Sequence, residues 1–187
     1  MPDSPYLSDH LLIAMPALGD PNFSRSVTLI CQHDADGAMG LVINRQGDYT
    51  IGDLLAQLDI ACERPALRER RVLAGGPVQP ERGFVVHGDD QSWHSTLKVG
   101  PGLAVTSSRD ILAALALGEG PRDMLVTLGY AGWEAGQLEA ELAENSWLTA
   151  PASHQILFHT PLEQRWQAAA RAVGVDLSRL TDYAGHA

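Results

Sequence analysis

Polar side chains and glycines follow several predicted strands in the N-terminal half of the sequence, at the points where those strands end. Loops at a sheet edge often carry binding residues, because the rigid sheet positions them. Two of these side chains are arginines, whose guanidinium groups bind phosphate and carboxylate through paired hydrogen bonds. Each residue also has a plainer interpretation as a turn former or a surface charge. We predict a site for a small anionic ligand made of Asn22, Arg25, His33, Asn44, Arg45, Gly75 and Gly76.

The histidines do not form a metal-binding pattern. Zinc sites need three or four converging ligands, often spaced as H-x-H, H-x-x-x-H or H-E-x-x-H. None of these spacings occurs among His33, His87, His94, His154 and His159. The sequence therefore predicts no metal site and no cofactor.

Catalytic motifs are also missing from the sequence. There is no Gly-x-Ser-x-Gly elbow to present a serine nucleophile. His33 and Asp34 face opposite sides of a predicted strand, so they cannot orient each other. Gly75-Gly76-Pro77 lacks the Lys-Ser/Thr ending of a phosphate-binding loop, and a strand is predicted after it, which favours a tight bend. We predict a non-catalytic protein and keep open a small hydrolase whose residues meet only in the fold.

A short acidic helix is predicted near the middle of the chain, over residues 135–143. Its carboxylates at Glu139, Glu141 and Glu144 face different directions on a helix, whereas a metal or catalytic site needs them to converge. We therefore interpret them as a solvated face. Trp133 and Trp147 flank the helix and are predicted to be packing anchors.

Apolar periodicity and turn residues divide the rest of the chain. Strands are predicted over 11–15, 26–33, 40–44, 72–74, 82–87, 96–99, 103–106, 125–128 and 154–159. The last-but-one strand is predicted to lead into a turn hinged at Gly129, Gly132 and Gly136. Further helices are predicted from a Thr50–Asp53 capping box through Leu58, from Ser107 or Ser108 to Gly118, and from Thr160 as N-cap to Gly174. A short polar tail, 175–187, is predicted to follow.

The order of these elements indicates the fold class. Strands mostly precede helices, which favours an α+β fold over a doubly wound one. Glycine-rich corners at 75–77 and 100–102 are typical of a sheet that bends or partly closes. We predict a mixed, mainly antiparallel, bent or partly barrelled sheet flanked by helices.

Composition narrows the function. The 187 residues, 45% apolar and 19% charged, are typical of a soluble globular protein, and we predict one domain over residues 1–187. A net charge of −10 argues against nucleic acid, because neutralising phosphate supplies most of that affinity. Arg64, Arg68, Arg70 and Arg71 form a small basic cluster, interpreted as the end of a polar linker or, alternatively, as a contact for an anionic partner.

The N-terminal residues and the cysteines indicate the compartment. The N-terminus has no basic region, and Pro16 interrupts the apolar run 11–18, which is too short to span a membrane. We therefore predict a cytoplasmic protein with no membrane contact. Cys31 and Cys62 do not form a disulfide framework. Cys31 is interpreted as a core residue, with a redox-sensing thiol as the alternative.

Several segments resemble the AlgH/YqgE family of bacterial proteins. They read LLIAMPALGDPNFSRSV, HDADGAMGLVINR, AGGPV, RGFVVH and LGYAGWEAGQLEAELAENSWL. Gln46 departs from the proline expected after Asn44-Arg45. The resemblance implies a mixed α+β fold with a bent or partly barrelled sheet, and no established enzymatic activity. The family also carries a transcriptional-regulator label, but this acidic sequence has no helix-turn-helix pattern, which argues against direct DNA binding.

Together these observations predict a non-catalytic regulatory module. Its expected partner is a small anionic metabolite or another protein. The small hydrolase remains the alternative.

Overall fold

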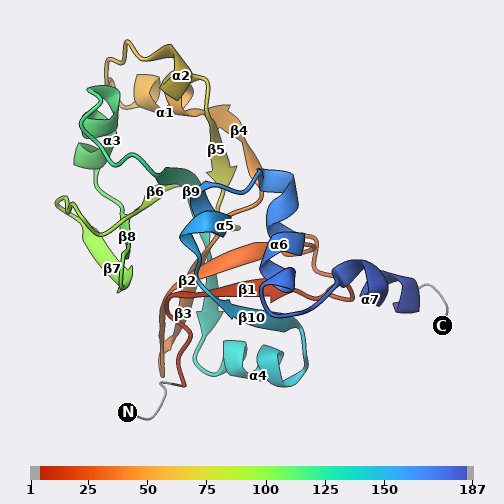
Figure 1. Cartoon of the computed structure of the whole chain (residues 1–187). Coiled ribbons are helices and arrows are strands. Elements are labelled where there is room, and N and C mark those ends of the chain that lie inside the picture. Colours follow the sequence, from red (N-terminus) through yellow and green to blue (C-terminus); the bar gives the residue numbers. More distant parts are fainter. Residues whose placement is uncertain (1–4, 185–187) are drawn as a thin grey trace.

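The structure, a computed structural model, describes residues 5–184, with side chains up to residue 180. Ten strands form one sheet, in which β10, β1, β2, β3, β9, β6, β8 and β7 are neighbours in that order (Figure 1). A short branch of β4 and β5 joins this sheet at β9. The strands are β1 His10–Ala14, β2 Val27–Asp34, β3 Gly37–Val42, β4 Gln46–Thr50, β5 Arg71–Ala74, β6 Val78–His87, β7 Thr96–Gly100, β8 Leu103–Thr106, β9 Met124–Glu134 and β10 Trp147–Pro151.

The sheet is mixed and mainly antiparallel. Among the described strands only β5 and β9 pair in parallel. The sheet curls so that β7 approaches β2, which gives it the form of a partial barrel. The predicted α+β fold with a bent or partly barrelled sheet is therefore confirmed.

Helices flank the curled sheet in separate groups (Figure 1). They are α1 Ile51–Gln57, α2 Pro65–Arg68, α3 Arg109–Ala116, α4 Gln137–Ala143, α5 His154–Phe158, η1 Leu162–Gln164, α6 Arg165–Arg171 and α7 Leu177–Ala184. α1, α2 and α3 lie at one end of the molecule and α4 at the other, whereas α5 and α6 lie beside the sheet. Each group covers its own buried apolar cluster. The loops next to α1, α2 and α3 therefore lie together at one end of the molecule.

The long strand β9 connects these ends. Its first half pairs with β5 and β6, and its second half, from Ala131, pairs with β3. The predicted turn at Gly129 and Gly132 is therefore wrong, because partners on both sides keep the chain extended through these glycines. Gly129 has a φ of +78° and bends the strand where β5 ends against it. Only Gly136, at φ +76°, lies in the turn before α4.

Two predictions near the C-terminus are also wrong. The segment 154–159 is helix α5 and not a strand, since Ser153 caps it by accepting a hydrogen bond from the N–H of Ile156. Thr160 does not cap the following helix, because its hydroxyl donates to the carbonyl of Gln155 (2.9 Å). The chain instead passes through η1 before α6 begins at Arg165.

Other local predictions are confirmed or extended. Thr50 and Asp53 form the predicted capping box at α1, with reciprocal bonds of 3.1 and 2.9 Å. Ser108 is the N-cap of α3, although its hydroxyl donates to Asp110 and makes no capping bond. The segment predicted as a polar tail contains α7, and β4, β10 and α2 lie where the sequence predicted no strand or helix.

Cys31 is a core residue. Its side chain is 2% exposed, and burial raises the pKa of the thiol to about 12. A reactive thiolate needs the opposite shift, so this environment disfavours the redox-sensing alternative.

The acidic helix α4 is less solvated than predicted. Glu139 contacts the buried ring of His33. Glu141 is half-buried beside the indoles of Trp133 and Trp147, and burial raises the pKa of its carboxyl. Both tryptophans are buried, as predicted, and pack edge to face with ring centroids 6.3 Å apart.

No helix within residues 5–184 has the length and apolar character needed to cross a membrane.

Candidate functional site

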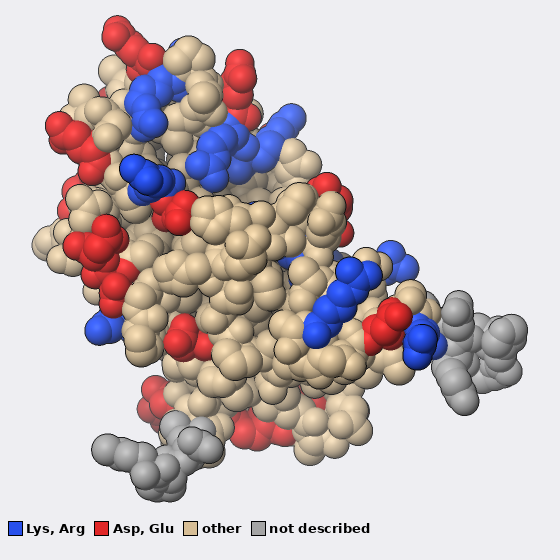
Figure 2. All heavy atoms as spheres, in the orientation of Figure 1, with Lys and Arg blue, Asp and Glu red and all other residues tan. Residues whose placement is uncertain are grey.

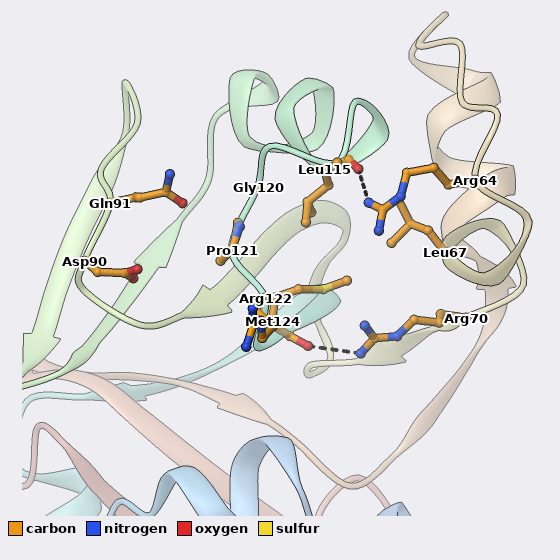
Figure 3. A pocket seen from close by; sticks show the side chains of 11 residues that line it. Arg64, Leu67, Arg70, Asp90, Gln91, Leu115, Gly120, Pro121, Arg122 and Met124 are labelled. Atoms are coloured by element: carbon orange, nitrogen blue, oxygen red, sulfur yellow. Dashed lines mark hydrogen bonds between the residues drawn. The ribbon is translucent and has the colours of Figure 1, made fainter.

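A cleft of about 620 Å³ opens at the end of the molecule that carries α1, α2 and α3. We call it the arginine cleft. It is lined by Arg64, Leu67, Arg70, Asp90, Gln91, Leu115, Gly118, Gly120, Pro121, Arg122 and Met124. Figure 3 shows Arg64 and Arg70 on one wall, Asp90 and Gln91 on the opposite wall, and Arg122 between them. Three guanidinium groups from two segments of the chain therefore face one cavity.

Packing of α2 places the first two arginines. Pro65 begins this short helix, and Leu67 is buried in the core, which leaves Arg64 at the N-cap and Arg70 beyond the C-terminal end. Arg64 Nη1 donates to the carbonyl of Leu115 at the end of α3 (2.7 Å). This bond ties α2 to α3 and leaves the other N–H groups of Arg64 available to a ligand.

Arg70 is anchored in a similar way on the same wall of the cleft. Its Nη2 donates to the carbonyl of Met124, the first residue of β9 (3.2 Å). Burial lowers the pKa of this guanidinium, which still remains protonated at neutral pH because its ordinary pKa is so high. Arg70 is thus a partly desolvated positive charge held in a defined position.

Arg122 completes the set from the segment between α3 and β9. Its side chain is exposed. In the described part of the chain, neither Arg122 nor Arg64 nor Arg70 forms an ion pair within 4 Å, although Asp90 lines the same cleft. The cleft therefore carries positive charge that is not neutralised by a direct contact.

The surface charge distribution agrees with this description. Figure 2 shows Lys and Arg side chains gathered in the upper part of the molecule, over the region of α1, α2 and β5. Acidic side chains lie among them at the top and spread along the left edge and the lower end of the same face. A protein with a net charge of −10 thus carries several of its basic side chains at one end, interspersed with acidic ones.

Four of the residues predicted to bind a ligand come together in the structure. Asn44 accepts a hydrogen bond from the N–H of Val27 (2.8 Å) and donates to the carbonyl of Arg25 (2.9 Å). Arg45 donates to the carbonyls of Asn22 and Ser24. These bonds fasten the loop before β2 to the corner after β3. Ligand binding by this group stays a prediction.

The remaining predicted residues lie in different places. The carbonyl of Gly75 accepts from the N–H of Val42 (2.8 Å), which puts Gly75 and Gly76 beside the same corner. Both glycines press against the backbone of β9. His33 lies at the far end of β2, where its Nδ1 accepts from the N–H of Leu7 (2.9 Å). The structure therefore does not bring His33 to the other six.

Pairs that resemble catalytic groups are enclosed or misaligned. His87 Nδ1 donates to the carbonyl of Gly88 (2.5 Å), so its Nε2 accepts from the hydroxyl of Thr106 (2.7 Å). This base and hydroxyl are both 0% exposed, so the pair is enclosed by the protein. Ser108 donates to Asp110, which also accepts from the backbone N–H groups of His94 and Ile111. In residues 5–184 no three His, Cys, Asp or Glu side chains gather as metal ligands.

Sequence reasoning found part of the arginine cleft and missed the rest. Arg64 and Arg70 belong to the basic cluster for which an anionic partner was the alternative interpretation. Arg122 stands alone in the sequence, and no local pattern marks it. Its place is decided by the pairing of β9, which begins two residues later.

Comparisons with known sequences agree on one family. A family model described as AlgH-like matches residues 11–178. A UPF0301 protein of Xanthomonas campestris pv. campestris is 62% identical over 181 residues, which cover 97% of this chain and 96% of that protein. A UPF0301 protein of Stenotrophomonas maltophilia is 60% identical over 187 residues, which cover 100% of both chains.

Solved structures extend this agreement to the fold. The solution structure of the AlgH protein from Pseudomonas aeruginosa matches with a TM-score of 0.81 and 51% identity, covering 100% of both chains. A crystal structure from Corynebacterium diphtheriae, at 20% identity, matches with a TM-score of 0.72 and covers 94% of this chain and 91% of that one, which shows a shared fold. The resemblance seen in the sequence is confirmed, and the chain belongs to the AlgH-like family.

Proposed function

We propose that this protein is a non-catalytic regulatory module that binds a small anionic ligand in the arginine cleft. The observation that carries the proposal is the convergence of Arg64, Arg70 and Arg122 on one cavity without a direct carboxylate partner. A volume of about 620 Å³ lies within the range typical of sites for small metabolites.

Phosphate and carboxylate groups are the ligand chemistry that fits best. Guanidinium groups donate several N–H bonds in a fixed plane, and charge-assisted hydrogen bonds to oxyanions are roughly twice as strong as neutral ones. Arg64 and Arg70 are already oriented by bonds to backbone carbonyls, so a ligand orders fewer side chains when it binds. This preorganisation supports binding of a small phosphorylated molecule.

The position of the proposed ligand site supports the proposed regulatory role. The two walls of the cleft come from α2 and from the loop that carries Asp90 and Gln91. An anion that bridges the arginines stabilises their present arrangement, and a second protein can then recognise that surface. The enclosed pair of His87 and Thr106 supports a non-catalytic role over the hydrolase alternative.

Ligand binding is tested by thermal unfolding with a set of nucleotides and phosphorylated sugars, each compared with NaCl at the same ionic strength. Arg122→Gln tests the site because Arg122 is exposed and its loss leaves the core intact. Loss of one charge-assisted contact is expected to weaken binding about 10- to 100-fold. Arg171→Gln, an exposed arginine on α6, is the control and is expected to bind like the wild type.

Two results would overturn the proposal. One is a flat thermal response to every anion in the set. The other is equal binding by the Arg122→Gln variant and the wild type, which would place the ligand elsewhere.

The predicted location, domain organisation and class of partner are also part of this proposal. A cytoplasmic location agrees with the acidic composition, and cell fractionation tests it. One domain over residues 1–187 is supported by the continuous sheet, and a single cooperative unfolding transition tests it. Nucleic acid is not the proposed partner, because a net charge of −10 opposes the approach of phosphate backbones.

A further inference from the structure

A buried arginine lies next to the arginine cleft. Arg165 is the first residue of α6 and is only 8% exposed. Its Nε donates to the carbonyl of Thr160 (3.0 Å), and its Nη1 donates to the carbonyl of Ile43. Both partners are neutral. Among the described side chains no carboxylate lies within 4 Å of this guanidinium.

An unneutralised buried charge is unfavourable in a folded protein. Arginine is almost never fully buried unless it is paired, and removing its solvation costs several kcal/mol in general. Burial lowers the pKa of Arg165, and the neighbouring charge of Arg70 lowers it further, although Glu163 acts partly in the opposite direction. The structure thus places two positive charges near each other with little compensation.

A cavity gives access to these charges. A cleft of about 330 Å³, which we call the Arg165 cleft, is lined by Arg165, Arg70, Arg71 and Glu163 together with apolar residues of β5, β9 and η1. Arg70 lines both this cleft and the arginine cleft, whereas Arg122 lines only the arginine cleft and Arg71 only this one. The two cavities are therefore neighbours that can be tested separately.

We propose that the Arg165 cleft is a second anion site, which takes a phosphate-type group between Arg165, Arg70 and Arg71. An oxyanion there supplies the negative charge that the buried guanidinium lacks, and the Nη2 of Arg165 and the exposed side chain of Arg71 supply donors. The inference does not depend on occupancy of the arginine cleft.

The test titrates the whole protein with inorganic phosphate at constant ionic strength and measures binding by calorimetry. A titration with chloride is the blank. Arg71→Gln is the main variant, because this side chain is exposed and makes a long contact with the carbonyl of Asp48 (3.4 Å) and an electrostatic contact with Asp53, so the core is left intact. We expect phosphate binding at the Arg165 cleft to weaken about 10-fold or more in this variant. Arg122→Gln is expected to keep phosphate binding at the Arg165 cleft.

Arg165→Met is the second variant, and it removes the buried charge itself. Because it also removes two hydrogen bonds, its folding is checked first by circular dichroism. If it folds, it is expected to lose the same phosphate binding as Arg71→Gln. Glucose 6-phosphate is titrated in parallel, since binding of both probes indicates the phosphate group of a larger molecule and binding of inorganic phosphate alone indicates a site for the free ion.

The outcomes separate this inference from the proposed function. Unchanged phosphate binding in both Arg71→Gln and Arg165→Met, or no phosphate binding by the wild type, overturns the second site. If phosphate binding weakens in Arg71→Gln but not in Arg122→Gln, the result supports the second site and counts against the arginine cleft. If each variant loses part of the phosphate binding of the wild type, the result supports two sites.

Discussion

Replacing Gly129 with alanine is expected to destabilise the protein more than the same change at either of two neighbouring glycines. Gly129 lies inside β9 with a φ of +78°, a backbone conformation that alanine adopts only with strain. A Cβ built on Gly129 falls closer than 3.0 Å to the carbonyl oxygen of Gly76 and 3.2 Å from Cα of Pro80. Both neighbours are backbone, so neither can rotate away.

The magnitude follows from two separate terms. Alanine in the left-handed conformation costs about 1–2 kcal/mol, and forcing a methyl group into a packed region costs about 1–3 kcal/mol more. For Gly129→Ala we expect the free energy of unfolding to fall by about 2–5 kcal/mol. At about 2–4 °C per kcal/mol for a protein of this size, the melting temperature falls by roughly 4–20 °C.

Two control variants separate the backbone strain from the steric crowding. Gly136 has a φ of +76° with no atom within 4 Å of a built Cβ, so Gly136→Ala is expected to show the strain alone, about 1–2 kcal/mol. Gly132 has an ordinary φ, and its nearest neighbour is a tyrosine ring atom at 3.7 Å. Gly132→Ala is therefore expected to change stability by less than about 0.5 kcal/mol.

Urea unfolding followed by circular dichroism measures all three variants under one condition. Equal slopes against urea are required, so that a shifted midpoint reports stability alone. If Gly129→Ala lies within error of Gly136→Ala, the close approach of Gly76 and Pro80 to β9 is refuted. The interpretation of Gly75 and Gly76 as residues that admit this approach then also fails.

Two further perturbations test the helices. Glu141→Gln is expected to raise the melting temperature at pH 7, because burial raises the carboxyl pKa of Glu141 above its ordinary value of 4.5 and the charged form therefore destabilises the folded protein. That penalty disappears as the pH falls through the raised folded pKa and below 4.5, so the advantage of Glu141→Gln over the wild type should vanish in acid. Thr50→Ala is expected to cost about 1 kcal/mol in urea unfolding by removing the cap of α1, whereas Thr50→Ser should recover most of it; equal stability of the two would contradict the capping box.

Local patterns predicted the elements whose partners are close in sequence. The capping box at Thr50 and the hairpin of β2 and β3 were predicted, because each depends on hydrogen bonds or alternation within a few residues. The segment 154–159 was wrongly predicted as a strand, since six residues with three consecutive apolar positions, 156–158, fit either period. Gly129 and Gly132 were wrongly predicted as a turn, because their strand partners come from distant β3, β5 and β6.

The residues of the candidate sites divide in the same way, into those visible in the sequence and those that only the fold brings together. Arg64, Arg70 and Arg71 stand together in the sequence, and their shared charge was visible there. Arg122 and Arg165 belong to separate later segments, and only the tertiary structure brings each of them to a cleft beside Arg70. His33 was predicted to join the ligand site, but the fold places it at the far end of β2, away from the other predicted residues.

By itself, the sequence determined the AlgH-like family, the α+β class, the acidic charge and most of the local elements. These properties depend on composition and on residues that are neighbours along the chain. The tertiary structure decided which charges meet, because burial of apolar side chains sets the path of the backbone, and charged side chains are carried to wherever that path leads. The desolvated position of Arg165 is therefore a property of the packed molecule that no local pattern encodes.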